Sequence, residues 1–210
     1  MTYAVKELFK TLQGEGGQAG RAAVFCRFAG CNLWSGREQD RAMAICQFCD
    51  TDFVGTDGIG GGAFKSSTEL ADAILRAWGA RPDRRYVVFT GGEPLLQLDE
   101  QLVEAVHAHG FTIAVETNGT IAAPPGIDWI CVSPKAGTQL AQVSGEELKL
   151  VYPQTATKPE GFEHLQFKHF FLQPLDGPDQ VRNTELAVAY CLENPRWRVS
   201  LQCHKLMRIP

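Results

Sequence analysis

Three cysteines in a polar, irregular stretch are the residues of this chain best suited to hold a metal centre. Cys31 follows Gly30, and Cys46 and Cys49 stand three residues apart further along the chain. Two thiolates at that spacing chelate one centre readily, and a third can close from a flexible loop. A structural zinc ion needs four ligands, whereas a [4Fe–4S] cluster held by three cysteines leaves one iron open. The spacing favours the cluster, with zinc plus a distant fourth ligand, or unligated thiols, as alternatives.

A second set of polar motifs follows five apolar runs that are typical of buried strands. Ligand sites in parallel α/β folds lie at the carboxyl ends of the strands, so we expect these motifs to meet on one rim. The adjacent Gly91 and Gly92 let backbone carbonyls approach a ligand, and Glu93 could accept its ammonium group; a simple turn is the alternative. The motifs are residues 90–94, 116–119, 133–135, 173–176 and 202–205.

The elements that must position these motifs alternate along the chain. Alternating strands and helices indicate βαβ units and a parallel sheet. A full eight-unit barrel usually needs about 250 residues, so this chain is short for one. We therefore expect an α/β fold that is a partial, incomplete parallel barrel, formed by one domain over residues 1–210 with a cluster-binding loop at about 30–66. Strands are predicted at 3–9, 22–29, 86–90, 111–116, 129–132, 147–152, 169–173 and 197–202, and helices at 67–78 (capped by Ser67), 99–109 and 179–193.

Composition excludes several classes of protein. The chain has 210 residues, of which 44% are hydrophobic and 21% charged, as in globular proteins. A net charge of −4 without a Lys/Arg cluster disfavours direct nucleic-acid binding, and no apolar run approaches the ~18 residues of a membrane span. The N-terminal stretch does not resemble an export signal, and the seven cysteines are an odd number. We therefore expect a reducing cytoplasm, with Cys26, Cys131, Cys191 and Cys203 as buried, inert thiols.

Taken in order, the motifs resemble the 7-carboxy-7-deazaguanine synthase family of the radical S-adenosylmethionine (SAM) superfamily. The resemblance runs from residue 12 to about residue 205. One departure concerns the cysteines, which the superfamily commonly spaces C-x3-C-x2-C, whereas fourteen residues separate Cys31 from Cys46 here. The same three ligands can meet only if the intervening loop folds back. The motifs that carry the resemblance are residues 12–16, 49–51, 90–94, 116–120, 133–135 and 202–205.

The resemblance implies a carbon–nitrogen lyase of 7-deazapurine (queuosine) biosynthesis. Such an enzyme converts 6-carboxy-5,6,7,8-tetrahydropterin to 7-carboxy-7-deazaguanine with loss of ammonia, and a radical derived from SAM carries the reaction, so no catalytic side chain is expected. The implied cofactors are a [4Fe–4S] cluster on Cys31, Cys46 and Cys49, SAM, and Mg²⁺ at Thr51. The implied SAM-binding residues are Gln47, Phe48, Cys49, Asp50, Gly91, Gly92, Glu93, Glu116, Ser133, Pro134, Lys135, Gln173, Pro174, Leu175 and Asp176.

The resemblance also implies a pterin site on the same rim. Arg27 could pair the substrate carboxylate bidentately, or could simply form a surface ion pair. We also expect the short tail after Ser200 to fold back over the site, so that the carboxylate of Pro210 accepts from a pterin amine. The implied substrate-binding residues are Leu12, Gln13, Gly14, Glu15, Arg27, Thr90, His204 and Pro210.

The expected partners are the small-molecule pterin, an electron donor such as flavodoxin or ferredoxin, and a second copy of the chain, because a shortened barrel leaves an open edge. No direct nucleic-acid partner and no membrane are expected. The alternatives are a radical SAM enzyme that activates a glycyl-radical protein or modifies tRNA, and a non-enzymatic zinc-binding module. A brown colour after anaerobic purification distinguishes the cluster from the colourless zinc module.

Overall fold

One open, nine-stranded sheet runs through the protein. The computed structural model describes residues 2–210. The strand order is β3-β1-β2-β4-β5-β6-β7-β8-β9, and every neighbouring pair from β2 onward is parallel, while β1 runs antiparallel to β2 and β3. The strands are β1 (Tyr3–Leu12), β2 (Ala22–Phe28), β3 (Gly62–Phe64), β4 (Tyr86–Gly91), β5 (Thr112–Thr117), β6 (Trp129–Val132), β7 (Ser144–Tyr152), β8 (Gln166–Pro174) and β9 (Trp197–Val199).

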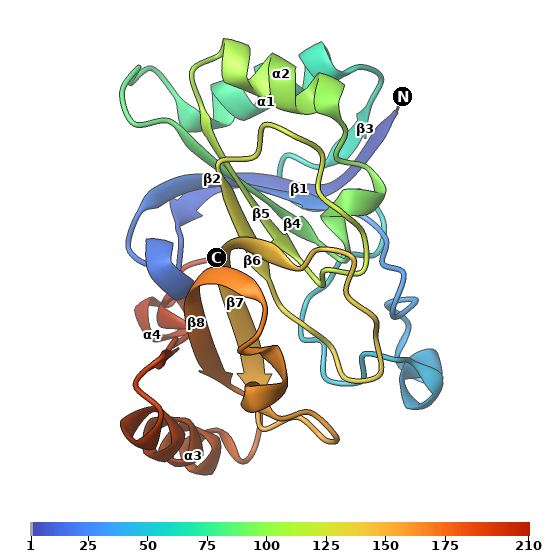
Figure 1. The fold of residues 1–210 in the computed structure, drawn as a ribbon. Helices are drawn as coiled ribbons and strands as arrows, with labels where there is room; N and C mark the ends of the chain where they lie inside the picture. The colour runs from blue at the N-terminus through green and yellow to red at the C-terminus, as the bar shows by residue number, and fades with distance from the viewer. Residues whose placement is uncertain (1) are drawn as a thin grey trace.

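Helices cover the outer side of this sheet in two separate groups (Figure 1). α1 (Ser67–Trp78) and α2 (Glu100–Ala108) lie side by side over β1, β2 and β5, whereas α3 (Gln180–Glu193) packs on β8 and β9 at the far end. A short α4 (Cys203–Met207) follows β9. The partial α/β barrel expected from the sequence is confirmed.

Three local expectations differ from the structure. The predicted last strand ends at Val199, and the residues from Cys203 form α4 instead. Helix α1 is capped by Ser66, whose side chain accepts from the amide of Glu69, so Ser67 is the first helical residue and not the cap. The strand β3 was not predicted, because a three-residue strand depends on pairing with β1 and has no periodicity of its own.

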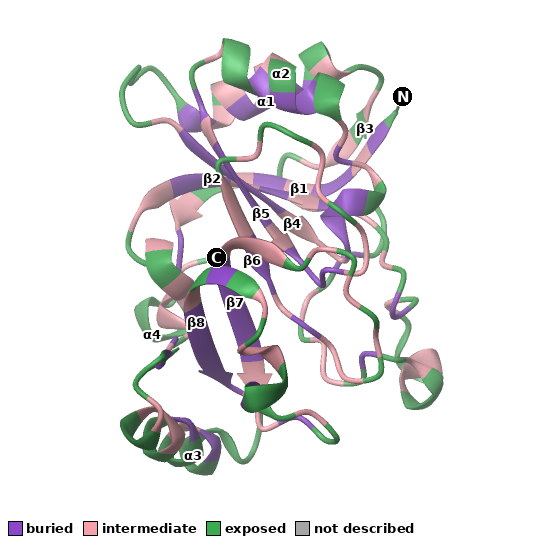
Figure 2. Cartoon of the chain, viewed as in Figure 1, coloured by how far each residue is buried: buried purple, intermediate pink, exposed green. Residues whose placement is uncertain are grey.

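The two faces of the sheet have different chemistry. Along β4, Val87 and Phe89 point to the outer core with α1 and α2, whereas Tyr86 and Val88 point to the inner face. The buried residues are purple in Figure 2 and follow the strands and the sheet-facing sides of α1 and α2. An apolar floor of Ala23, Tyr86, Val88 and Ala114 closes the inner face toward the amino ends of the strands, so polar groups are left to its carboxyl end.

In residues 2–210, helix length and apolarity never reach what crossing a membrane requires.

The outer core predicts a clear difference between two positions of α1. Ile74 is fully buried against the sheet, and Arg76, two residues further on, is exposed. We expect Ile74→Ala to lower the free energy of unfolding by about 2–5 kcal/mol, because it leaves a cavity. The control Arg76→Ala should change it by less than about 0.5 kcal/mol. Urea unfolding followed by circular dichroism measures both; equal losses would show that α1 is not packed as described.

Candidate active site

The loop between β2 and β3 brings the three cysteines together despite the long separation between the first two. The amides of Ile45 and Cys46 donate to the carbonyl of Leu33 at 3.1 and 3.4 Å, so the chain turns back toward Cys31. The extra residues form a short 3₁₀ helix, Glu38–Met43, outside this turn. All three thiols are free, and they line one small cavity together. Burial raises the pKa of the Cys31 and Cys46 thiols.

Arg41 holds the segment around Cys49 in place by hydrogen bonds. Its guanidinium donates to the carbonyls of Gln47 and Cys49 at 2.9 and 3.0 Å and lies 4.1 Å from the ring centre of Trp34. Trp34 in turn packs edge-on against Phe53 with 5.6 Å between ring centres. The loop path is therefore fixed by main-chain contacts and an aromatic pair, and not by the cysteines alone.

The separation of the thiols fits a cluster better than a single ion. Three sulfur ligands of one zinc ion would lie about 3.8 Å apart, given Zn–S bonds of about 2.3 Å. In residues 2–210, the one group of three potential metal-ligand atoms within 4.8 Å of one another is elsewhere, at Glu116, Cys131 and Glu147. The three thiols share a cavity, but at least one pair of them lies more than 4.8 Å apart. A centre with several metal atoms spans such a distance, which makes the donor set suitable for an iron–sulfur cluster.

The two glycines at the end of β4 are needed for close packing against β2 and the first cysteine. A Cβ on Gly91, whose φ is +132°, would lie 2.2 Å from the carbonyl oxygen of Phe28. A Cβ on Gly92 would lie 2.2 Å from the carbonyl oxygen of Gly30 and 2.7 Å from Cβ of Cys31. Any side chain at either position would therefore push the Cys31 segment away from the end of β4.

Glu93 is held by hydrogen bonds within the protein. Its side chain is fully buried, and its oxygens accept from the hydroxyl of Thr117 at 2.7 Å and from the amides of Asn118 and Leu95 at 2.8 and 3.0 Å. Burial raises the pKa of this carboxyl group. The side chain connects the ends of β4 and β5 and does not line the large cavity. The expectation that Glu93 accepts the ammonium of a ligand stays a prediction.

A cavity of about 420 Å³ collects the remaining strand-end motifs, which confirms that they meet on one rim. Its volume is typical of sites for small molecules. Among the residues implied for SAM, three do not line it: Glu93, Gln47, whose amide donates to the carbonyl of Ala42, and Pro134, whose carbonyl accepts from Gln154. Those that do are Phe48, Cys49, Asp50, Gly91, Gly92, Glu116, Ser133, Lys135, Gln173, Pro174, Leu175 and Asp176.

All eight residues implied for the pterin line the same cavity, as does Thr51. The tail folds back as expected: Pro210 lies at the cavity, and its carbonyl accepts from the hydroxyl of Thr11 at 2.9 Å. His204 contacts Gly14 so closely that a Cβ there would lie 2.3 Å from the imidazole Nδ1. Lys205 pairs with Asp50 at 2.7 Å and with Asp176, so α4 is tied to the cysteine loop and to β8.

Arg27 forms an ion pair and faces the cavity at the same time. Its Nε donates to Glu7 at 2.6 Å, and both residues line the cavity. Because Glu7 takes Nε, both terminal nitrogens of the guanidinium are left for another acceptor. Lys135 is also placed for an anion: its ammonium donates to the carbonyl and hydroxyl of Ser133 at 2.8 and 2.7 Å, and burial lowers its pKa.

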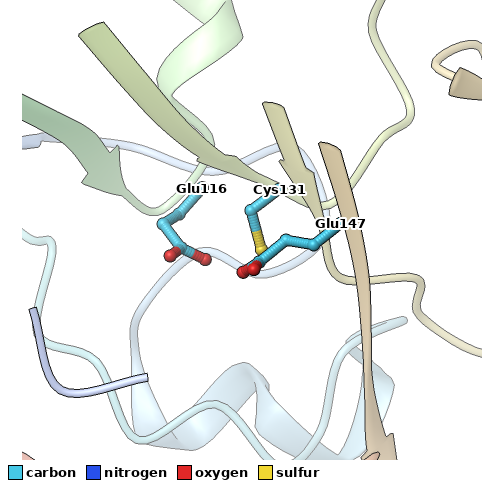
Figure 3. A group of neighbouring side chains, drawn as sticks. All are labelled: Glu116, Cys131 and Glu147. Carbon is cyan, nitrogen blue, oxygen red and sulfur yellow. The ribbon is translucent and has the colours of Figure 1, made fainter. Parts of the chain in front are cut away.

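Sequence reasoning missed a charged group in the interior of the sheet. Glu116, Cys131 and Glu147 stand at paired positions on β5, β6 and β7 and converge on the inner face (Figure 3). Lys149, two residues after Glu147, adds an ammonium to the group. The signal in the sequence is that Glu147 and Lys149 alternate with apolar residues in one strand, so both side chains share a face. Cys131, expected to be an inert thiol, lies in this polar group.

The sequence and the fold are both similar to those of known proteins. Residues 40–145 match the model of the Radical SAM superfamily. The chain is 68% identical over 210 residues to the 7-carboxy-7-deazaguanine synthase of Bordetella pertussis and 65% identical over 210 residues to that of Caulobacter vibrioides, covering 100% of each chain in both cases. The crystal structure of QueE from Escherichia coli is similar with a TM-score of 0.69 and 27% identity, covering 97% of this chain and 95% of that one.

The glycine pair predicts a test of the cysteine site. We expect Gly92→Ala to lose most of its iron and sulfide after anaerobic reconstitution, because the new Cβ displaces Cys31. Gly161→Ala is the matched control, since no atom lies within 4 Å of its Cβ and its φ is not in the left-handed region. Iron and sulfide analysis and the brown absorbance measure the effect. Wild-type iron content in Gly92→Ala would contradict the close packing described.

Proposed function

Because the chain belongs to the 7-carboxy-7-deazaguanine synthase family of the radical SAM superfamily, we propose that it converts 6-carboxy-5,6,7,8-tetrahydropterin to 7-carboxy-7-deazaguanine with loss of ammonia. This makes it a carbon–nitrogen lyase of 7-deazapurine biosynthesis. One observation carries the proposal: a single cavity extends from Cys46 and Cys49 to the loop at Gln13–Glu15 and the tail. A cofactor at the cysteines and a pterin at the loop would therefore lie against each other. Neither a zinc module nor a protein-activating enzyme explains that arrangement.

The cluster is assigned to Cys31, Cys46 and Cys49, which share the small cavity beside Gly92 and Lys135. When bound, the reduced [4Fe–4S] cluster and SAM supply a carbon-centred radical, which is chemistry that the side chains of the chain cannot perform. The protein's contribution is then to bind, to orient and to exclude water. Lys205 pairs with Asp50 and Asp176 and so holds α4 against the cavity, where the helix helps to exclude water.

We assign SAM to the cavity wall nearest the cysteines. Phe48 offers an apolar face for the adenine ring of SAM. Because Glu93 is buried, we assign the ammonium of SAM to the backbone of Gly91 and Gly92. The Lys135 ammonium, fixed by Ser133, suits the carboxylate of SAM. Ribose hydroxyls are donors for carboxylate and amide oxygens. The acceptors assigned to them are Glu116, Gln173 and Asp176.

We assign the pterin to the opposite wall. Arg27 presents two terminal nitrogens, which match a carboxylate bidentately, while Glu7 fixes the guanidinium from the other side. Gln13 and Glu15 offer an amide and a carboxylate to the donor and acceptor edge of the pterin ring. Leu12, Gly14, Thr90, His204 and Pro210 complete this wall.

We also propose a compartment, an electron donor and an oligomeric state for this enzyme. We place it in the cytoplasm, because all seven cysteines are free. Residues 1–210 are treated as one domain, since one sheet supplies both walls of the cavity. A one-electron donor such as flavodoxin or ferredoxin is needed to reduce the cluster. A homodimer is proposed on the ground that α3 exposes apolar Val181, Val188 and Leu192.

An anaerobic turnover assay tests the reaction. The reconstituted wild-type protein with reductant, Mg²⁺, SAM and 6-carboxytetrahydropterin should form a product lighter by one ammonia, with many turnovers per SAM. We expect Cys31→Ala to lose activity and iron entirely, whereas Cys191→Ala on α3, outside both cavities, should keep both. Mass spectrometry follows the product. Formation of 5′-deoxyadenosine without that product would mean that the substrate is wrong.

A magnesium requirement tests the role of Thr51. One hydroxyl is a weak ligand for Mg²⁺, so the substrate carboxylate must supply much of the binding. We expect wild-type protein to bind the pterin about tenfold more tightly with Mg²⁺ than without it. Thr51→Val keeps the shape of the side chain and should remove this difference. Calorimetric titration measures it, and equal affinities with and without Mg²⁺ in the wild type would refute the magnesium site.

A further inference from the structure

Lys149 is a buried cation for which neither ligand assignment accounts. It stands on β7 between the apolar Leu148 and Leu150, and only 5% of its side chain is exposed. Its ammonium lies 2.6 Å from Oε2 of Glu15 and 2.8 Å from Oε2 of Glu116. A lysine buried to this degree is retained only where its charge is balanced.

The two carboxylates held by Lys149 come from different walls of the cavity. Glu15 belongs to the loop after β1, on the wall assigned to the pterin, and Glu116 ends β5, on the wall assigned to SAM. Gln13 joins them a second time: its amide donates to Glu116 at 3.1 Å, and its oxygen accepts from the backbone of Glu15 at 3.1 Å. The other oxygen of Glu15 accepts from Gln202 at 3.1 Å. Every carboxylate oxygen of Glu15 and Glu116 thus accepts a hydrogen bond.

The groups that face this ammonium are Glu15, Glu116, Glu147 and Cys131, and His204 faces Glu15 from α4. Burial alone would raise the pKa of Glu15, but Lys149 and Gln202 lower it to about 2. Burial would likewise lower the pKa of Lys149, but the acidic groups around it raise that pKa well above its usual value. Burial raises the pKa of Cys131 and of Glu147. The pKa of Glu147 is thus shifted in the opposite direction to that of Glu15.

We propose that Lys149 is a positioning residue that holds Glu15 and Glu116 oriented together, and thereby makes the binding of the pterin and of SAM mutually dependent. The inference rests on the proposed function, since it needs one ligand on each wall. Both carboxylates share this one ammonium, so a ligand that donates to one of them changes the charge and the position that the other offers to the second ligand. The coupling must be reciprocal: each ligand improves the affinity for the other by the same factor.

The experiment measures binding and not turnover. Anaerobically reconstituted holoenzyme without reductant is titrated calorimetrically with 6-carboxytetrahydropterin, alone and at saturating SAM, and then in the reverse order. We expect each ligand to tighten the other about tenfold in the wild type, and this factor to fall to near one in Lys149→Met. Lys149→Arg, which keeps the charge, should retain part of it. Lys168→Met is the matched control, because Lys168 makes an exposed pair with Glu146 on the neighbouring strand and should leave the coupling unchanged.

A pH series separates positioning from general loss of structure. In Lys149→Met the buried Glu15 loses its cation, so its pKa rises and the group becomes protonated as the pH falls. Pterin affinity in this variant should therefore weaken toward acid pH and recover as the pH rises, relative to the wild type measured over the same range. Lys149→Arg should follow the wild type.

The outcomes distinguish a failure of the inference from a failure of the proposed function. Wild type without coupling, or Lys149→Met with the wild-type coupling factor and pH profile, overturns the inference while the proposed function stands. Wild type that binds SAM but no pterin overturns the proposed function itself, and the inference with it. If Lys149→Met does not fold, the double variant Lys149→Met/Glu147→Gln, which removes one charge of each sign and keeps both ligand-binding carboxylates, is measured instead. Its SAM affinity should not respond to the pterin, and a wild-type response would refute the proposal.

Discussion

The balance of charge on the inner face of the sheet is the constraint on which the rest of the structure depends. Moving a carboxylate out of water costs several kcal/mol unless a partner compensates it, and this face carries three glutamates within reach of one lysine. The strand register makes compensation possible, because it places Glu116, Cys131 and Glu147 at paired positions on adjacent strands. A shift of one residue in β5 or β7 would turn a charged side chain into the outer apolar core. The buried charges therefore specify the alignment of the strands as much as the strands position the charges.

The helices on the outer face of the sheet hold the strands in this arrangement. The outer face packs α1 and α2 on one half of the sheet and α3 on the other, which leaves the inner face to the cavity. The contacts that shape the cavity are of another kind. The main chain packs closely at Gly91 and Gly92. Arg41 donates hydrogen bonds to two carbonyls, and Lys205 forms ion pairs with Asp50 and Asp176. Apolar packing builds the frame, and hydrogen bonds and ion pairs set the positions of the loops on it.

Much of this could be predicted from the sequence, because it depends on local patterns. Cys31, Cys46 and Cys49 stand out by type and spacing, and the strand-end motifs follow from the rule that parallel strands end at one rim. What could not be predicted depends on contacts between distant segments. The direction of Glu93 is set by Thr117 and Asn118 on the next strand, and a motif alone does not show which way its carboxylate points. Lys149 meets Glu15 across a separation of 134 residues, which no periodicity reveals.

The strands at the two ends of the sheet have a consequence for the behaviour of the protein at high concentration. A barrel that does not close leaves two edges, whose unpaired backbone groups are templates for aggregation. Here the edges are β3 and β9, and each is three residues long. So short an edge offers another chain few hydrogen bonds, and Arg198 adds a charge in the middle of β9. Each end of the open sheet thus finishes in a strand that is too short to pair extensively with a neighbouring molecule.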